Sequence, residues 1–281
     1  MLTPLIPIFL ACTLGLQTSP AQPAESQPVA KSQPMVLPLA RGLVSRYVKE
    51  IGGRVALWDL ESFTAHATLA FTGGQATGQL DLAFRRPNLM RIHLDLADLG
   101  SSVVGSDGLS AWEIVTTDKV EEAEIIPMAD AQRRRRELNW FELAIRLTEG
   151  ARSFRTVAPA EFENYPCWEI QKITRDGVEE RLFIDREHFL LRGIRMIEEG
   201  PLEDHEVTMS FRDWKPIKPL LLFHELAVTR DDIELIIRFD KISLDTVSPT
   251  TFQPPPSVED LLRAIPQDEP PVEDDPGESQ P

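Results

Sequence analysis

The five histidines are the side chains best suited to metal binding or acid–base catalysis, and their spacing supports neither. They are His66, His93, His188, His205 and His224, and no pair has the H-x-H or H-E-x-x-H spacing of a common zinc site. His66 and His93 fall on the polar faces of predicted strands, and His188 lies in a charged hairpin, so we interpret them as solvated. His224 and Glu225 are strand neighbours that point to opposite faces and cannot act as a dyad.

Other catalytic patterns are also missing from the sequence. Gly105-Ser106-Asp107-Gly108 is not a G-x-S-x-G nucleophile elbow, and the glycines at 73, 74 and 78 have no following helix that would complete a phosphate-binding loop. No spacing singles out a pair of carboxylates. Cys167 begins an apolar strand pattern, which favours a buried hydrophobe over a nucleophile. We predict that the protein is not an enzyme and has no catalytic residues, no metal site and no cofactor.

The basic cluster Arg133–Arg136 leaves two interpretations open. It is suited to nucleic acid or a phospholipid headgroup, but such a run is more often the solvated face of a helix, balanced here by Glu137. The chain of 281 residues has a formal net charge of −16, which argues against nucleic acid as a partner. Its hydrophobic fraction of 42% is typical of a folded domain.

The prolines divide the chain into three parts. Residues 1–38 hold seven of the 23 prolines and residues 254–281 hold eight. The second segment also has eight acidic residues and one basic residue. We predict a Pro-rich flexible linker at 22–38, a domain at 39–253, and an acidic, Pro-rich, disordered tail at 254–281.

Residues 1–21 are predicted to be a signal peptide, so we expect a periplasmic protein. Residues 2–16 are almost wholly apolar, too few for a transmembrane helix, and Ser19-Pro20-Ala21 follows as a small-residue cleavage site. The segment has no Lys or Arg before the apolar run. Phe9-Leu10-Ala11-Cys12 loosely resembles a bacterial lipobox, which makes a lipid anchor on Cys12 the minor alternative.

Hydrophobic periodicity predicts an α+β fold. Apolar residues at three- and four-residue spacing predict a helix over 39–53, ended by Gly52-Gly53, and another within 128–149. Alternation with period two predicts about 11–12 strands elsewhere, joined by links too short for parallel crossovers. The expected architecture is a highly curved antiparallel sheet, an unclosed β-barrel, covered by a helical lid. If the helices fill the concavity loosely, an apolar groove suited to lipid remains.

Large apolar side chains on the predicted buried faces are the candidate lipid-binding residues, and two interpretations remain open for them. They line an adaptable pocket for acyl chains, or they simply fill a core. The candidates are Phe63, Leu69, Phe71, Leu82, Phe84, Met90, Ile92, Leu94, Trp112, Ile114, Trp168, Met209, Phe211 and Phe239.

Several short motifs resemble those of the periplasmic outer-membrane lipoprotein carrier and sorting family (LolA-like, lipoprotein-binding fold). They are the helix at 44–53, the strand at 62–71, Arg86-Pro87-Asn88-Leu89-Met90-Arg91, Asp107-Gly108-Leu109-Ser110-Ala111-Trp112, and Thr250-Thr251-Phe252-Gln253-Pro254-Pro255. The long acidic tail and Asp213-Trp214 depart from the pattern.

The resemblance implies a carrier that holds acyl chains non-covalently in an apolar cavity between sheet and helices. Its partners would be lipoprotein acyl chains or another lipid, with membrane-bound donor and acceptor proteins. Burial contributes about 0.8 kcal/mol for each CH₂ group, so partly enclosed chains already bind usefully. The alternative is a non-catalytic periplasmic sensor or protein-interaction module on the same fold.

Overall fold

The computed structural model describes residues 36–72, 76–97, 99–175, 177–198 and 204–264. The predicted signal peptide, almost all of the predicted linker and residues 265–281 lie outside the described residues. None of the helices in the described ranges is long and apolar enough to cross a membrane.

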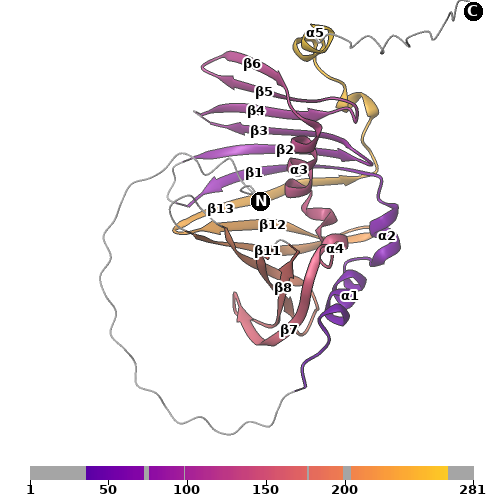
Figure 1. The fold of residues 1–281 in the computed structure, drawn as a ribbon, viewed down its shortest axis with the longest axis vertical. Coiled ribbons are helices and arrows are strands. Elements are labelled where there is room, and N and C mark those ends of the chain that lie inside the picture. The colour runs from indigo at the N-terminus through magenta and orange to yellow at the C-terminus, as the bar shows by residue number, and fades with distance from the viewer. Residues whose placement is uncertain (1–35, 73–75, 98, 176, 199–203, 265–281) are drawn as a thin grey trace, which may run out of the picture.

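One antiparallel sheet of 13 strands dominates the fold (Figure 1). The first six strands are β1 (Ser62–Phe71), β2 (Thr77–Arg85), β3 (Leu89–Leu96), β4 (Gly100–Ser106), β5 (Ala111–Thr117) and β6 (Val120–Ile125). The other seven are β7 (Ala151–Phe162), β8 (Tyr165–Thr174), β9 (Glu179–Asp185), β10 (Leu191–Glu198), β11 (His205–Ile217), β12 (Leu220–Arg230) and β13 (Ile233–Leu244).

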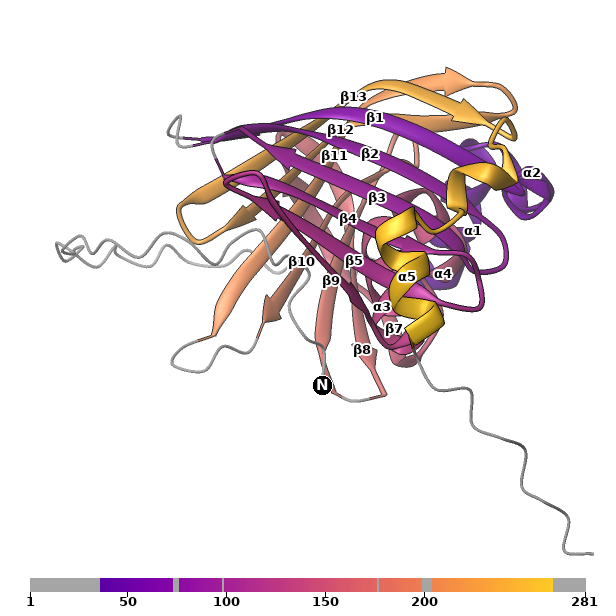
Figure 2. The same cartoon turned by 90° about the horizontal axis from the view of Figure 1, so that it is seen from above.

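The sheet consists of two meanders joined at their first and last strands. The order is β6-β5-β4-β3-β2-β1-β13-β12-β11-β10-β9-β8-β7, so β6 and β7 are its edges. Pairing of β1 with β13 brings Phe63 opposite Leu244. The sheet is strongly curved and does not close (Figure 2). This confirms the predicted unclosed antiparallel sheet, with 13 strands where 11–12 were expected.

Four helices and a 3₁₀ turn cover one face of the sheet, which we call the inner face. They are α1 (Ala40–Glu50), α2 (Gly53–Asp59), α3 (Met128–Leu138), the 3₁₀ turn η2 (Trp140–Glu142) and α4 (Leu143–Arg146). Their apolar side chains belong to one cluster with the inner-face residues of the strands, including Leu43, Tyr47 and Leu57. The curvature of the sheet around these helices follows from the need to bury this face.

The helix boundaries differ from the prediction in two places. The first predicted helix ends before Gly52-Gly53, as expected, but these glycines, with φ values of 122° and 86°, turn the chain into a second helix, α2, that was not predicted. The predicted helix within 128–149 is broken into α3, η2 and α4.

The start of the predicted disordered tail is ordered instead. After the 3₁₀ turn η3 (Pro249–Phe252), helix α5 (Pro256–Ala264) packs beside β6 and buries Val258 completely. Val258 forms a small cluster with Trp112 and Ile114 on the opposite face of the sheet, which we call the outer face. Composition alone could not predict this short amphipathic helix, because the segment around it is acidic and rich in proline.

The β7–β8 hairpin bends back across the outer face and is held there. Its two-residue turn, Glu163-Asn164, has φ values of 48° and 65°, which are typical of a tight hairpin turn. The Phe162 ring lies against Gly193 and stacks on Phe183, with ring centroids 4.6 Å apart.

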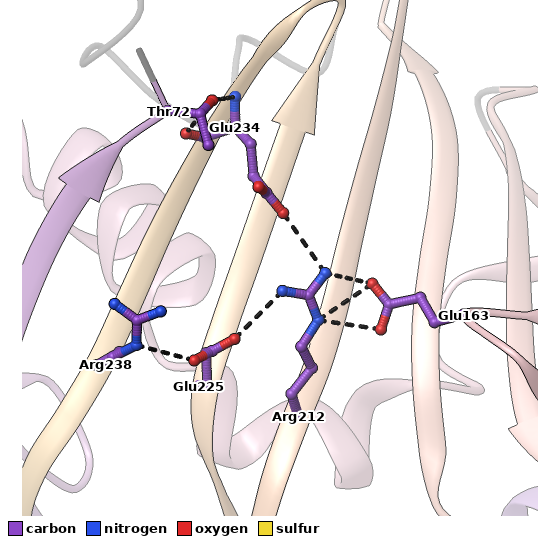
Figure 3. A network of polar contacts seen from close by, with 6 residues as sticks. All are labelled: Thr72, Glu163, Arg212, Glu225, Glu234 and Arg238. Atoms are coloured by element: carbon purple, nitrogen blue, oxygen red, sulfur yellow. Dashed lines mark hydrogen bonds and ion pairs between the residues drawn. The ribbon is translucent and has the colours of Figure 1, made fainter. Parts of the chain in front are cut away.

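A charged network fixes the same hairpin to β11 (Figure 3). Arg212 donates to both carboxylate oxygens of Glu163 and, at 3.2 Å, to Glu225, which also accepts from Arg238. Burial alone would raise the pKa of Glu163, but hydrogen bonds from Arg212 and Ser210 outweigh it and hold that pKa below its usual value.

Candidate functional site

The inner face brings together most of the predicted lipid-binding residues. Nine are buried within one continuous cluster: Phe63, Leu69, Leu82, Phe84, Met90, Ile92, Met209, Phe211 and Phe239. Phe71, Leu94 and Trp168 are partly buried and pack against it. These twelve residues come from six strands spread over both meanders. The alternation of apolar residues therefore predicted a shared apolar face across the sheet.

Trp112 and Ile114 do not join this group. They lie on the outer face of β5 and pack against α5. The Trp112 ring lies over Gly105, where a methyl group would come within 2.5 Å of the indole nitrogen. Both faces of β5 are thus covered, so alternation alone could not assign these two residues to the inner face.

A chain of aromatic contacts, absent from the sequence prediction, crosses the inner face from one group of helices to the other. Tyr47 of α1 meets Trp214 at a centroid distance of 6.1 Å. Trp214 meets Phe223 at 5.7 Å, Phe223 meets Phe239 at 5.8 Å, and Phe239 meets Trp140 of η2 at 6.0 Å. Edge-to-face pairs of this kind stabilise by about 0.5–1.5 kcal/mol each beyond area burial.

Asp213-Trp214, which had no assigned role, has a structural one here. Asp213 has a φ of 54°, in the left-handed region, and the Trp214 indole donates to the carbonyl oxygen of Phe211 at 3.1 Å. Burial raises the pKa of Tyr47 well above its usual value, so its hydroxyl stays neutral at physiological pH.

Charged groups tie the segment α3–η2–α4 to the rest of the molecule, in addition to the apolar side chains that it places in the inner-face cluster. Glu142 accepts from Arg86 at 3.2 Å and from Arg135 at 3.4 Å. Arg86 also donates to the carbonyl oxygens of Trp58 and Leu57 at the end of α2. The predicted basic cluster thus has a structural use, which includes a 2.8 Å pair between Arg134 and Glu113 of β5.

This segment also holds buried donors that are not hydrogen-bonded. Within the described residues, Nε of Arg135, Nδ2 of Asn139 and Nε of Arg146 are buried without a hydrogen-bond partner. Burial lowers the pKa of Arg146, against the opposing effect of Glu142. Each such group destabilises its surroundings by about 1–3 kcal/mol. This segment therefore leaves more of its buried side-chain donors without hydrogen bonds than the sheet beneath it does.

The expected groove between sheet and helices is occupied by helix side chains in this conformation, because residues of both layers share one cluster. Acyl chains would enter only if a helical segment moved. Across the described ranges, no group of three or more His, Cys, Asp or Glu side chains is arranged to hold a metal ion. Burial raises the pKa of the Cys167 thiol to about 11, which makes it a poor nucleophile.

No protein-family model and no curated protein matches this sequence. The fold is similar to that of a DUF1329 family protein from Desulfovibrio piger, with a TM-score of 0.52 and 11% identity, covering 76% of this chain and 97% of that one.

Two further matches carry the family name that the sequence motifs suggested. A LolA superfamily protein from Nitrosomonas europaea matches with a TM-score of 0.48 and 8% identity, over 78% of this chain and 99% of that one. An outer-membrane lipoprotein-sorting protein domain from Vibrio parahaemolyticus, itself described as putative, matches at 0.49 and 11%, over 79% and 97%. At these identities, likeness concerns the fold alone.

Proposed function

We propose that this chain is an exported carrier that binds the acyl chains of a lipid or lipoprotein on the inner face of its sheet. The proposal rests on a difference between the strands and the helices that meet at the inner face. Twelve large apolar side chains from six strands lie on one side. On the other lies a helical segment that packs apolar side chains against them, forms ion pairs with Arg86 and Glu113, and contains three buried, unpartnered donors.

We assign the lid to α3–η2–α4. A segment with unsatisfied buried groups opens at lower cost than the strands, since opening exposes those groups to water. Opening would break the Arg134–Glu113 pair and uncover Phe84, over whose ring Arg135 lies at 5.9 Å. Acyl chains would then replace the helix side chains against the apolar face.

A cross-link across the lid tests this function. In Glu113→Cys/Arg134→Cys, a short thiol-reactive cross-linker would tie α3 to β5. We expect the untreated variant to take up a fluorescent fatty-acyl lipid and the cross-linked variant to lose most uptake. The matched control is Arg195→Cys/Glu206→Cys, which replaces a similar ion pair between β10 and β11. Uptake that survives cross-linking would refute the assignment of the lid, and uptake that is absent from every variant would refute the carrier function.

The alternative function, a sensor or interaction module without cargo, is favoured by one observation: the inner face is already covered in this conformation. It predicts no co-purified lipid and a stable protein partner. Native mass spectrometry of protein expressed in the periplasm separates the two, because the carrier should retain acyl species.

A further inference from the structure

A hollow of about 360 Å³, lined by both charged and apolar side chains, opens on the outer face of the sheet. It lies over β1, β2, β3 and β13, beside Thr251 of η3. Its charged and titratable lining consists of His66, Asp81, Arg91, His93 and Lys241. The volume is within the range of small-molecule sites, about 300–1,000 Å³.

The strand register explains why a hollow forms here. One cross-strand row carries Lys241, His66, Asp81 and His93 on four adjacent strands. In a second row, Ala83 stands between Thr64 and Arg91. The small side chain of Ala83 leaves space among longer neighbours. Ala83 also packs with Phe252 and Val247, which holds η3 in place as the wall of the hollow.

The charges in the hollow leave an excess of cations. The Asp81 carboxylate is engaged by His66 at 2.7 Å and lies 3.7 Å from His93. Within the described residues, Arg91 and Lys241 take part in no ion pair, although the chain has a net charge of −16. With the histidines neutral, the two cations outnumber the Asp81 carboxylate by one, and this positive excess in an acidic protein is suited to an anion.

We propose that this hollow binds a phosphate group, carried by a small solute or by a lipid headgroup. The guanidinium of Arg91 and the ammonium of Lys241 are cationic donors of the kind that bind phosphate oxygens by charge-assisted hydrogen bonds. The hydroxyls of Thr64 and Thr251 supply further donors. This site does not depend on acyl-chain binding at the inner face, so either proposal can fail alone.

Calorimetric titration of the full chain with inorganic phosphate tests the site. We expect Arg91→Gln and Lys241→Gln each to weaken binding at least tenfold. Lys215→Gln, an exposed lysine on β11 outside the hollow, is the matched control and should bind like the unsubstituted protein. Binding equally strong in all three variants would overturn the proposal.

Sedimentation with vesicles identifies the source of the phosphate. Binding to phosphatidylglycerol vesicles but not to phosphatidylcholine vesicles, lost in Arg91→Gln/Lys241→Gln, would support a headgroup. Binding of inorganic phosphate without vesicle binding would support a free solute. Absence of both inorganic phosphate binding and vesicle binding would overturn the site, as would equal binding to both vesicles.

Discussion

At the scale of single residues, two glycines make room for aromatic rings on the outer face. A methyl group on Gly193 would lie 2.1 Å from Cζ of Phe162, and one on Gly105 would meet the Trp112 indole. An aromatic ring placed over a strand glycine covers backbone that the glycine leaves without a side chain. The contact of Phe162 with Gly193 joins strands that are distant in sequence, whereas Gly105 and Trp112 lie opposite each other in the β4–β5 hairpin. The sequence pattern predicted neither contact.

Gly193→Ala should destabilise the fold by about 1–3 kcal/mol, because the added methyl forces Phe162 away from Phe183. Urea unfolding measures the change. Gly42→Ala is the control: it lies in α1, where a methyl meets only Leu39 at 3.9 Å, and should stabilise by up to about 1 kcal/mol. Equal stability of the two variants would contradict the assigned packing.

Asp185 is a second residue with a large expected effect. Its buried carboxylate accepts from the backbone of Glu187 at 2.8 Å and of His188 at 3.0 Å, and from Arg192. Burial alone would raise the pKa of Asp185, but these hydrogen bonds outweigh it and hold the pKa below its usual value. The ionised form is therefore the one that stabilises the fold.

Asp185→Ala should lose about 3 kcal/mol at pH 7, since Arg192 is left buried without its partner. The pKa of Asp185 is lower in the folded than in the unfolded chain. The stabilisation is thus complete above the unfolded pKa of about 3.9 and is lost as pH falls through the folded value. Urea unfolding at a series of pH values should show the two proteins converging below pH about 4. A constant difference would count against this role.

At the scale of elements, the strands were more predictable from sequence than the helices. The predicted strand at 62–71 coincides with β1 (Ser62–Phe71). Period-two alternation arises because one side of a strand is buried, and this holds whichever strands lie beside it. Helix α5 was missed because its only fully buried residue, Val258, lies in a segment whose composition suggests disorder. The contact of Glu142 with Arg86 joins residues far apart in sequence, and no spacing rule predicts it.

Helix α5 should be required for full stability. A chain ending at residue 253 exposes Trp112 and Ile114, at a cost of about 2–4 kcal/mol from the burial of these side chains. A chain ending at residue 264 keeps α5 and is the control. Thermal unfolding and the quenching of tryptophan fluorescence by acrylamide report the two effects. Equal behaviour of both chains would show that α5 does not cover the outer face.

Glu142 should hold the lid segment specifically. Glu142→Gln weakens the ion pairs to Arg86 and Arg135, so hydrogen exchange should accelerate over 128–147 and stay unchanged in β12 and β13. Asp260→Asn breaks an exposed pair with Arg263 and should change neither region. Acceleration spread evenly over the sheet would argue against a separate lid.

At the scale of the whole molecule, one core unites the two meanders. The inner-face cluster includes residues of β1–β3 and of β8–β13, together with α1–α4. The aromatic chain from Tyr47 to Trp140 runs through it without interruption. We therefore expect the described domain to unfold in one step, with coincident transitions by tryptophan fluorescence and far-ultraviolet circular dichroism. Separate transitions would show that the meanders are independent units.

The open ends of the sheet carry a further consequence, which concerns self-association. A sheet that does not close leaves two strands with unpaired backbone groups that invite pairing between molecules. Edge strand β6 places Glu121, Glu122 and Glu124 among its six residues, and edge strand β7 contains Pro159. The charges on β6 and the missing N–H on β7 oppose pairing of edge strands between molecules. Replacing the β6 glutamates with apolar residues should therefore make the protein aggregate.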